Sequence, residues 1–443
     1  MADRRSAREI LALVTDDRTF TELTHPVRES GPDGPLAWQG YDASRARAAD
    51  RTGESESVVC GTATVGGTRA VLIAFEFGFL GGSLGERTGD RLESAYTYAR
   101  EHRLPVVPLV ATGGSRMQEG MIALTQLQRV ARQSVLTREA GLAQIAVLRD
   151  PTTGGGWATL GAGADVVLAL PGAQVGFAGS RVRPPDADPT AYTAEAQVAA
   201  GAADAIVGPE ELRETLGRWL RLLTTPWAGQ APVPAPLGST GLPATGWEAV
   251  RRARAPQRPR AERYLDDYFT HRLAISGDRC GGTDAGMLCG FGERAGRTIA
   301  FAAQAGTATR PAGYRTAARL LRLADRLGVP VLTLVDTPGA ANDAEAERQG
   351  AGAAIADLFG AVASVRVPVT TLLIGEGGSG GALALAAPGN TWATPDSYFS
   401  VIAPEPATAI LKRAPAETER TADQLRVRPE DLAELGVTRT GPV

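Results

Sequence analysis

Two stretches of this chain repeat the same order of elements, and the repetition constrains the fold more than any other feature. In the first half, residues 57–77 carry a hairpin signal, residues 86–103 an amphipathic helix pattern, and residues 106–110 a buried-strand pattern. The second half repeats a strand, a helix and a strand at residues 298–305, 313–328 and 330–335. Strands that alternate with helices favour an α/β fold with largely parallel sheets. We therefore predict two domains related by internal duplication, with a site between the two halves.

Glycine-rich turns follow predicted strands in both halves. The first half has them at residues 113–114 and 154–156, and the second half has them at residues 377–378 and 380–381, within GEGGSGGA (375–382). A strand, glycines and a helix start leave backbone N–H groups at the positive end of a helix dipole, where they can bind an oxyanion. A glycine turn can equally be a plain connection between a strand and a helix. On these residues alone, both interpretations stay open.

A change in composition at residues 226–260 predicts where the chain divides. This stretch contains seven prolines and the basic run RRARAPQRPR. Such composition is typical of an inter-domain linker. We expect an N-terminal domain at residues 1–225, a linker at 226–260 and a C-terminal domain at 261–443. The basic run is expected to be a solvated surface, with contact to a phosphate as the alternative.

Composition argues against several classes of protein. The net charge is −3 and the only lysine is Lys412, so no bulk positive charge favours nucleic-acid binding. Cys60, Cys280 and Cys289 form no CxxC pair, and none of the three histidines has metal-ligand spacing, so we expect no metal site and a cytoplasmic location. There is no apolar run of membrane-spanning length, no GxxxxGK[ST] phosphate loop, and no GxSxG motif with a matching histidine.

Several motifs, taken in order, match a known family. FEFGFLGGSLG (75–85), ATGGSRMQE (111–119), DPTTGGG (150–156) and VGFAGSRV (175–182) resemble the β subunit of bacterial acetyl-CoA carboxylase carboxyltransferase. PQRP (256–259), residues 313–340, IGEGGSGGALAL (374–385) and YFSVIAPEPATAIL (398–411) resemble its α subunit. The chain therefore resembles a fused β–α carboxyltransferase of a biotin-dependent acetyl-CoA or acyl-CoA carboxylase. The resemblance implies two domains of the ClpP/crotonase ββα-superhelix fold.

The resemblance also implies a reaction, in which a carboxyl group moves from carboxybiotin to the α-carbon of a short acyl-CoA. Conversion of acetyl-CoA to malonyl-CoA, for fatty acid or polyketide biosynthesis, would pass through a thioester enolate. Biotin, on a separate biotin carboxyl carrier protein, would act as acid and base. Biotin carboxylase would be a further partner, and the chain would form a homo-oligomer with sites at protomer interfaces. We expect no membrane or nucleic-acid partner.

The same resemblance assigns the site residues. The catalytic positions, whose N–H groups would hold the thioester oxyanion in the first half and the biotin ureido oxygen in the second, are Gly113, Gly114, Gly155, Gly156, Gly377 and Gly378. The substrate-binding positions are Gly81, Gly82, Arg116, Gly339, Gly380 and Gly381, of which the last two would also face the ureido oxygen. Arg116 would either orient its turn or meet a CoA phosphate.

Three departures from the family pattern leave alternatives open. The four-Cys zinc module that often begins the β subunit is absent from this sequence, and Arg must replace Lys as the partner of CoA phosphates. After DTPGA, where the family has Tyr-Pro-Gly, this chain has Ala341, Asn342 and Asp343, and the segment to Ala351 also differs. One alternative is therefore an acyl-thioester enzyme of the same fold that works without biotin, such as a malonyl-thioester decarboxylase. Another is a non-catalytic scaffold, which the intact glycines of all four turns disfavour.

Overall fold

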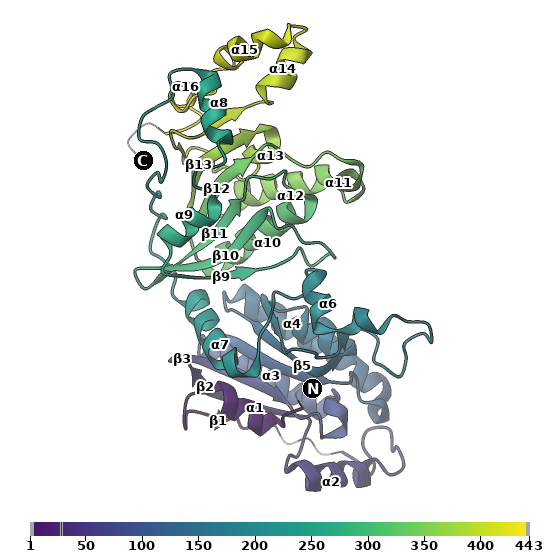
Figure 1. Cartoon of the computed structure of the whole chain (residues 1–443). Helices are drawn as coiled ribbons and strands as arrows, with labels where there is room; N and C mark the ends of the chain where they lie inside the picture. Colours follow the sequence, from purple (N-terminus) through teal and green to yellow (C-terminus); the bar gives the residue numbers. More distant parts are fainter. Residues whose placement is uncertain (1–3, 27, 29, 440–443) are drawn as a thin grey trace. The chain divides into compact units, whose positions relative to one another are not determined.

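The computed structural model describes residues 4–26, 28 and 30–439. Contacts between residues divide the chain into two compact units, Met1–Thr224 and Thr225–Val443 (Figure 1). The segment at 226–260, which the sequence suggests as a linker, belongs to the second unit and carries helix α8 (Gly246–Arg254). Its Trp227 N–H donates to the carbonyl of Thr298, so the start of this segment is bonded to the sheet of its own unit.

The N-terminal unit is built on an eight-stranded sheet in the order β1-β2-β3-β4-β5-β6-β8, with β7 paired to β5. The first three strands are antiparallel, and β3 to β6 run parallel. The strands are β1 (Thr21–Glu22), β2 (Val58–Val65), β3 (Thr68–Phe75), β4 (Val106–Thr112), β5 (Ile145–Thr153), β6 (Val166–Ala169), β7 (Val175–Gly176) and β8 (Ala205–Ile206). The helices are α1 (Ala7–Val14), α2 (Tyr41–Thr52), α3 (Glu86–Glu101), α4 (Gly120–Glu139), α5 (Gly154–Gly156), α6 (Ala194–Ala199) and α7 (Pro209–Thr224), with short turns η1 (Leu80–Gly82), η2 (Met117–Glu119), η3 (Trp157–Gly161) and η4 (Pro189–Tyr192).

The C-terminal unit repeats this plan with a seven-stranded sheet in the order β14-β13-β12-β11-β10-β9, and β15 paired to β13. Strands β9 to β11 are antiparallel and β11 to β14 are parallel. The strands are β9 (His271–Ile275), β10 (Met287–Arg294), β11 (Arg297–Gln304), β12 (Val331–Thr337), β13 (Val369–Gly378), β14 (Thr391–Ala393) and β15 (Tyr398–Ser400). Besides α8, the helices are α9 (Ala261–Tyr268), α10 (Pro311–Leu327), α11 (Ala344–Arg348), α12 (Ala351–Ser364), α13 (Ser379–Leu383), α14 (Pro404–Ile410), α15 (Thr418–Gln424) and α16 (Pro429–Glu434), with η5 (Pro415–Glu417).

Local sequence signals account for several element boundaries. The β2–β3 hairpin turns at Gly66 and Gly67, which both have positive φ, as such a turn requires. Helix α1 begins at a capping box, in which the Ser6 hydroxyl accepts from the Glu9 N–H and the Glu9 carboxylate accepts from the Ser6 N–H. Helix α10 ends at Gly328 in the left-handed conformation. The predicted hairpin at 57–77 and the predicted helix at 313–328 are therefore confirmed as β2–β3 and α10.

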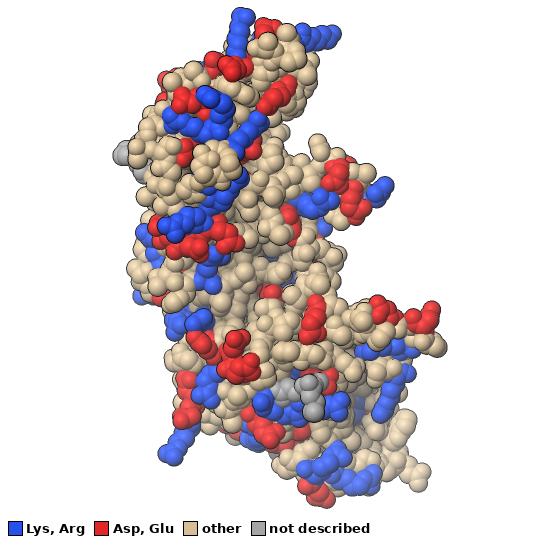
Figure 2. All heavy atoms as spheres, in the orientation of Figure 1, with Lys and Arg blue, Asp and Glu red and all other residues tan. Residues whose placement is uncertain are grey.

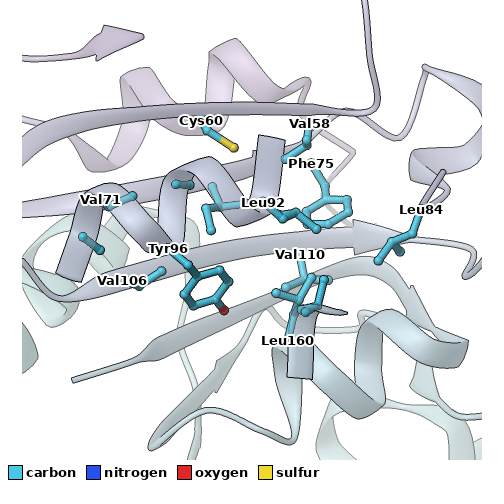
Figure 3. Close-up of a cluster of buried hydrophobic side chains, with 14 of the residues drawn as sticks. Val58, Cys60, Val71, Phe75, Leu84, Leu92, Tyr96, Val106, Val110 and Leu160 are labelled. Atoms are coloured by element: carbon cyan, nitrogen blue, oxygen red, sulfur yellow. The ribbon is translucent and has the colours of Figure 1, made fainter. Parts of the chain in front are cut away.

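The core of the N-terminal unit lies between the sheet and helix α3. Figure 3 shows Leu92 and Tyr96 of α3 packed against Val71, Phe75 and Val106 of the strands. The buried face of α3 consists of residues three and four apart, as the helical spacing predicts, and its apolar members are Leu92, Ala95, Tyr96 and Ala99. In the sheet, alternate residues of β3 enter this core, because successive side chains of a strand point to opposite faces.

Three apolar residues with helical spacing, Met117 in η2 and Met121 and Leu124 in helix α4, are not buried. Met117, Met121 and Leu124, spaced like one face of a helix, are 77%, 67% and 45% exposed. The buried face instead carries polar residues, with the Gln133 amide donating to Glu93 and the Ser134 hydroxyl bonded to Gln144. Buried polar groups are tolerated here because they find partners. The result is an exposed apolar stripe, Met117, Met121 and Leu124, beside the first glycine turn.

The two sheets share one irregularity in the parallel pairing, which confirms the duplication. In the N-terminal unit, the register between β4 and β5 shifts after Val110, so that Thr112 pairs with Thr152. In the C-terminal unit, the register between β12 and β13 shifts after Val335, so that Thr337 pairs with Gly377. In both units the shifted pair lies where the strands end and the glycine turns begin. Within residues 4–26, 28 and 30–439, no helix has the length and apolarity needed to cross a bilayer.

Candidate active site

The two glycine turns of the N-terminal unit lie against each other. A Cβ atom added to Gly154 would lie 3.3 Å from the Cα atom of Gly114. Gly82, which has positive φ, packs on the same turn, because a Cβ there would lie 2.1 Å from the carbonyl oxygen of Ala111. Close backbone approach of this kind requires glycine. The structure thus brings the predicted residues Gly82, Gly114 and the start of α5 together at the ends of β4 and β5.

The N–H groups of Gly113 and Gly114 already have acceptors within the chain. Gly113 donates to the carbonyl of Gly81 at 2.9 Å, and Gly114 donates to the hydroxyl of Thr112 at 3.0 Å. The expectation that both N–H groups bind a ligand oxyanion therefore does not fit this geometry. The physical reason is that η1 folds over the turn and supplies a carbonyl that strand-and-helix reasoning does not foresee. Gly81, Gly113 and Gly114 shape the turn.

Gly155 and Gly156 are buried residues of the first turn of α5. Thr153 is extended and Gly154 has φ of 63°, so the chain turns sharply into the first helical turn. The N–H groups of a first helical turn have no acceptor within the helix. The backbone must be bare here for packing reasons as well, since a Cβ on Gly155 would lie 2.3 Å from Leu127. A Cβ on Gly156 would lie 2.3 Å from a methyl of Thr112.

The C-terminal unit divides its predicted glycines between a strand and a turn. Gly377 and Gly378 are buried residues of β13, paired with Phe399 and Ser400 of β15. A Cβ on Gly378 would lie 2.0 Å from the carbonyl oxygen of Pro338, and one on Gly377 would lie 2.3 Å from the Phe399 ring. Close packing therefore explains why both are glycine. Gly377 and Gly378 therefore lie within a paired strand, whereas the turn at Gly380 and Gly381 follows the end of that strand.

Gly380 and Gly381 occupy the first turn of α13, in the same positions that Gly155 and Gly156 occupy in α5. Ser379 enters this turn with φ of 60°, as Gly154 does with 63°. Gly380 is exposed, and a Cβ added to it would meet nothing within 4 Å, so a ligand oxygen can approach the backbone there. Gly339, with φ of 140°, donates its N–H to the Thr337 hydroxyl at 3.2 Å, as Gly114 does to Thr112. The duplicated turns thus correspond residue by residue.

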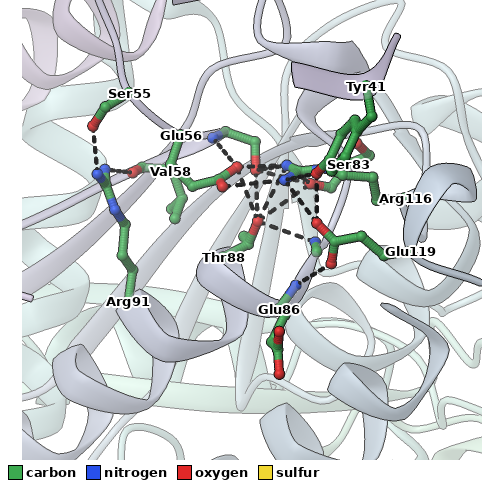
Figure 4. Close-up of polar contacts among 12 residues, drawn as sticks. Tyr41, Ser55, Glu56, Val58, Ser83, Glu86, Thr88, Arg91, Arg116 and Glu119 are labelled. Atoms are coloured by element: carbon green, nitrogen blue, oxygen red, sulfur yellow. Dashed lines mark hydrogen bonds and ion pairs between the residues drawn. The ribbon is translucent and has the colours of Figure 1, made fainter. Parts of the chain in front are cut away.

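A buried ionic cluster around Arg116 lies next to the turn at Gly113 and Gly114 (Figure 4). The Arg116 side chain is 1% exposed and forms an ion pair with Glu56, which is equally buried. Arg116 also donates to the carbonyl of Ser83 at 2.8 Å and to the Tyr41 hydroxyl at 3.2 Å. Glu119 accepts from the Tyr41 hydroxyl and from the Glu86 N–H at the start of α3. Arg116 is therefore engaged inside the unit and orients its turn; the alternative of contact with a CoA phosphate does not fit its burial.

Charge pairing sets the ionisation of this cluster. Burial by itself would raise the pKa of Glu56, but the charge and hydrogen bonds of Arg116 outweigh burial and hold that pKa below its ordinary value. Burial would lower the pKa of Arg116, whereas Glu56 raises it above its ordinary value. Burial also raises the pKa of the Tyr41 hydroxyl. Glu56 and Arg116 are thus a charged pair, and Tyr41 is a neutral donor to Glu119.

Sequence reasoning identified Arg116 but none of its partners. Glu56 and Tyr41 lie far before the Gly113-Gly114 turn in the sequence, and only the fold brings them to Arg116. Glu119 could have been found, because a buried arginine needs a carboxylate and Glu119 lies one helical turn beyond Arg116.

The C-terminal unit has a different ion pair at the end of its central strand. Asp336 of β12 is fully buried, and its carboxylate pairs with Arg258 at 2.5 Å and with Arg260 at 3.4 Å. The same carboxylate accepts the N–H of Glu376, which joins the ends of β12 and β13. Arg258 and Arg260 belong to the predicted basic run, so two of its arginines are structural. On the face shown in Figure 2, charges of both signs are interspersed over the surface.

Among the described residues, no group of three or more His, Cys, Asp and Glu side chains is placed to hold a metal ion.

Comparison with known families assigns each half of the chain. Residues 37–212 match the model of the carboxyl transferase domain, and residues 243–440 match that of the acetyl co-enzyme A carboxylase carboxyltransferase-like family. The acetyl-coenzyme A carboxylase carboxyl transferase subunits beta/alpha of Salinispora arenicola are 38% identical over 466 residues, covering 98% of this chain and 81% of the relative. A Mycobacterium tuberculosis protein named "Probable biotin-dependent acyl-coenzyme A carboxylase beta3 subunit" is 33% identical over 444 residues, covering 95% of this chain and 88% of the relative.

Solved structures support the fold. The transcarboxylase 12S crystal structure with hydrolysed methylmalonyl-coenzyme A superposes with a TM-score of 0.80 at 19% identity, covering 98% of this chain and 86% of that one. A single-chain, multi-domain long-chain acyl-CoA carboxylase gives a TM-score of 0.75 at 20% identity, covering 99% of this chain and 46% of that one. The predicted α/β fold of two duplicated crotonase-like domains is confirmed.

Proposed function

Since this chain belongs to the family of fused β/α acetyl-CoA carboxylase carboxyl transferases, we propose that it moves a carboxyl group from carboxybiotin to the α-carbon of a short acyl-CoA, with acetyl-CoA as the first candidate. Membership supports an enzyme of the acyl-CoA carboxyltransferase class that depends on biotin. The choice of acetyl-CoA, the product malonyl-CoA and a role in fatty acid or polyketide biosynthesis are the finer parts of the proposal.

The observation that carries the proposal is the matched first helical turn in each duplicated unit. Gly155 and Gly156 follow Gly154 in α5, and Gly380 and Gly381 follow Ser379 in α13; Gly154 and Ser379 both have positive φ. When bound, biotin supplies the carboxyl group and the proton acceptor. The chain itself supplies main-chain donors for oxygen atoms on which negative charge develops.

We assign the two turns to different reactants. In the N-terminal unit, the N–H groups of Gly155 and Gly156 would stabilise the thioester oxygen as the α-carbon loses its proton. In the C-terminal unit, those of Gly380 and Gly381 would bind the ureido oxygen of biotin, for which the open space beside Gly380 leaves room. Gly113 and Gly114, and likewise Gly377 and Gly378, would shape the two turns through close packing.

The partners in this proposal are a biotin carboxyl carrier protein, biotin carboxylase and a second copy of this chain. The exposed apolar stripe, Met117, Met121 and Leu124, supports self-association, because three large apolar side chains on one surface are typical of a covered face. Its position at the start of α4, next to the first turn, agrees with sites that form between protomers.

The reverse reaction tests the function directly. Purified protein is incubated with malonyl-CoA and biocytin, and loss of malonyl-CoA is followed together with formation of acetyl-CoA. We expect consumption that depends on biocytin. The same assay with methylmalonyl-CoA distinguishes the acyl group. If no short acyl-CoA exchanges its carboxyl group with biocytin, the proposed function is wrong.

A second candidate is a malonyl-thioester decarboxylase that works without biotin. The observation that favours it is the altered segment after β12, where Asp343 caps α11 and pairs with Arg310. Consumption of malonyl-CoA at the same rate with and without biocytin would support this candidate and contradict the first.

A further inference from the structure

A buried polar network lies directly beneath the glycine turn of the C-terminal unit. Gln304 ends strand β11 and Tyr314 belongs to α10, and both side chains are fully buried. The Gln304 amide donates to the carbonyl of Gly381 at 3.2 Å, and the Tyr314 hydroxyl donates to the same carbonyl at 3.1 Å. Two donors from two different elements therefore converge on one backbone oxygen.

The Gly381 carbonyl does not receive the backbone hydrogen bond that a regular α-helix would give it. In a regular α-helix, the carbonyl of Gly381 would accept from the N–H of Leu385. Here Leu385 donates to Ala382 instead, at 3.2 Å, while Ala384 donates to Gly380 at 3.0 Å. The chain thus ends α13 with a tighter turn, in which Leu385 bonds to the third residue before it. The donors to the Gly381 carbonyl are the side chains of Gln304 and Tyr314.

The side-chain amide of Gln304 is oriented so that its NH2 group, and not its oxygen, faces the Gly381 carbonyl. Its NH2 group donates both to Gly381 and to the Thr309 hydroxyl, at 3.2 and 3.3 Å. Among the described residues, no donor reaches the Gln304 amide oxygen, which is buried. An unpaired buried acceptor is destabilising, so a residue that retains one generally serves a purpose other than stability.

Among the described residues of the N-terminal unit, no side-chain donor stands at the positions that correspond to Gln304 and Tyr314. Gln304 is the last residue of β11 and corresponds to Phe75, the last residue of β3, because β3 pairs Val71 with Val106 as β11 pairs Ala300 with Val331. Leu84 and Thr309 are equivalent, because Leu84 donates its N–H to the Gly114 carbonyl and Thr309 donates to the Gly339 carbonyl. Tyr314, five residues after Thr309, therefore corresponds to Gly89, five residues after Leu84.

We propose that Gln304 and Tyr314 are positioning residues that hold the peptide plane between Gly381 and Ala382 and, through the Gly381 Cα atom, the direction of the preceding Gly380 and Gly381 N–H groups. The inference rests on the proposed function, in which this turn binds the ureido oxygen of biotin. A Cβ on Gly381 would lie 2.6 Å from the Tyr314 hydroxyl and 2.5 Å from the Ala340 nitrogen. The backbone of Gly381 is therefore closely packed against its neighbours, with no room for a side chain. The N-terminal turn, which we assign to the thioester, is unaffected by this network.

The experiment compares Tyr314→Phe and Gln304→Leu with a matched control, Tyr268→Phe. Tyr268 lies in the same unit, is equally buried, and donates its hydroxyl to the Pro232 carbonyl at 2.7 Å, away from the glycine turn. Each full-length variant is measured by amide hydrogen exchange over residues 378–385 and by the malonyl-CoA and biocytin assay. Thermal unfolding records any general loss of stability.

We expect faster exchange over residues 378–385 in the two network variants. We also expect about a tenfold fall in kcat/KM for biocytin, with an unchanged KM for malonyl-CoA. Tyr268→Phe should show neither change. Unchanged exchange in both network variants, or equal effects on the two substrates, would overturn the inference. An inactive wild-type protein would overturn the proposed function, whereas faster exchange in the same variants would still support the hold on the turn.

Discussion

The glycine turns of the two units have nearly the same backbone, but different side chains lie next to them. In the N-terminal unit, the buried ion pair of Arg116 and Glu56 lies beside the turn at Gly113 and Gly114. In the C-terminal unit, the neutral donors Gln304 and Tyr314 lie beneath the turn at Gly380 and Gly381. The backbone conformation is therefore the feature that the two units share, and each unit reaches it with different side chains. A charged support is costly to break, whereas a neutral one can be altered in small steps.

The largest expected effect is on the charged support. Arg116→Leu leaves Glu56 buried without its counter-ion, so we expect the N-terminal unit to lose about 3–5 kcal/mol of unfolding free energy. Urea unfolding, followed by hydrogen exchange of peptides from α3, measures this loss. Arg218→Ala, which removes an exposed pair with Glu214 in the same unit, is the matched control and should change stability by less than about 1 kcal/mol. Equal effects of the two variants would contradict the importance of the buried pair.

The next prediction distinguishes a glycine that leaves room for a ligand, Gly380, from one that leaves room for neighbouring backbone, Gly378. Gly380→Ala should fold normally, because its Cβ meets nothing within 4 Å, yet we expect transfer to biocytin to fall about 100-fold as the methyl enters the ligand's position. Gly378→Ala should instead destabilise the unit by about 1–3 kcal/mol, because its Cβ would lie 2.0 Å from the Pro338 carbonyl. Assay and thermal unfolding of both variants test this. A fully active Gly380→Ala would remove that turn from the site.

A third prediction concerns pH and only the N-terminal unit. Because the pKa of Glu56 is lowered in the folded protein, the stability it contributes is present above the ordinary glutamate pKa and is lost as pH falls through the folded value. As pH falls, we expect the N-terminal unit of the wild-type protein to lose stability more steeply than the N-terminal unit of the Glu56→Gln variant. Unfolding midpoints between neutral pH and pH 3 measure the difference. Parallel pH profiles would show that Glu56 does not carry the effect.

The smallest predicted effect compares two threonines in equivalent positions. Thr112 and Thr337 each accept the N–H of the glycine two positions later, Gly114 or Gly339. The Thr337 hydroxyl also donates to the Thr307 carbonyl at 2.7 Å. Thr337→Val should therefore cost about 1–2 kcal/mol, and Thr112→Val about 1 kcal/mol or less. Thermal unfolding of the two variants measures both costs, and a larger cost at Thr112 would contradict the comparison.

Sequence reasoning reached the candidate site as far as local chemistry allows. The glycine turns and the strands that precede them were identified from motif and spacing, and the resemblance to a known family assigned these glycines and Arg116 to the site. Which N–H groups stay open was not predictable, because the acceptor of Gly113 is Gly81, which reaches it only through the fold of η1. The exposure of Met117 and Met121 was equally hidden, since apolar spacing on a helix does not tell which face the rest of the chain covers.

The amino-acid sequence by itself determined the duplication, the alternation of strands and helices, and the positions at which only glycine fits. These follow from periodicity and backbone sterics, which act over a few residues. The tertiary structure alone decided that Glu56 neutralises Arg116, that Gln304 and Tyr314 share the Gly381 carbonyl, and that Gly113 donates to Gly81. Hydrogen bonds and ion pairs between distant segments depend on where the whole sheet places its strand ends, and that placement is a property of the packed unit.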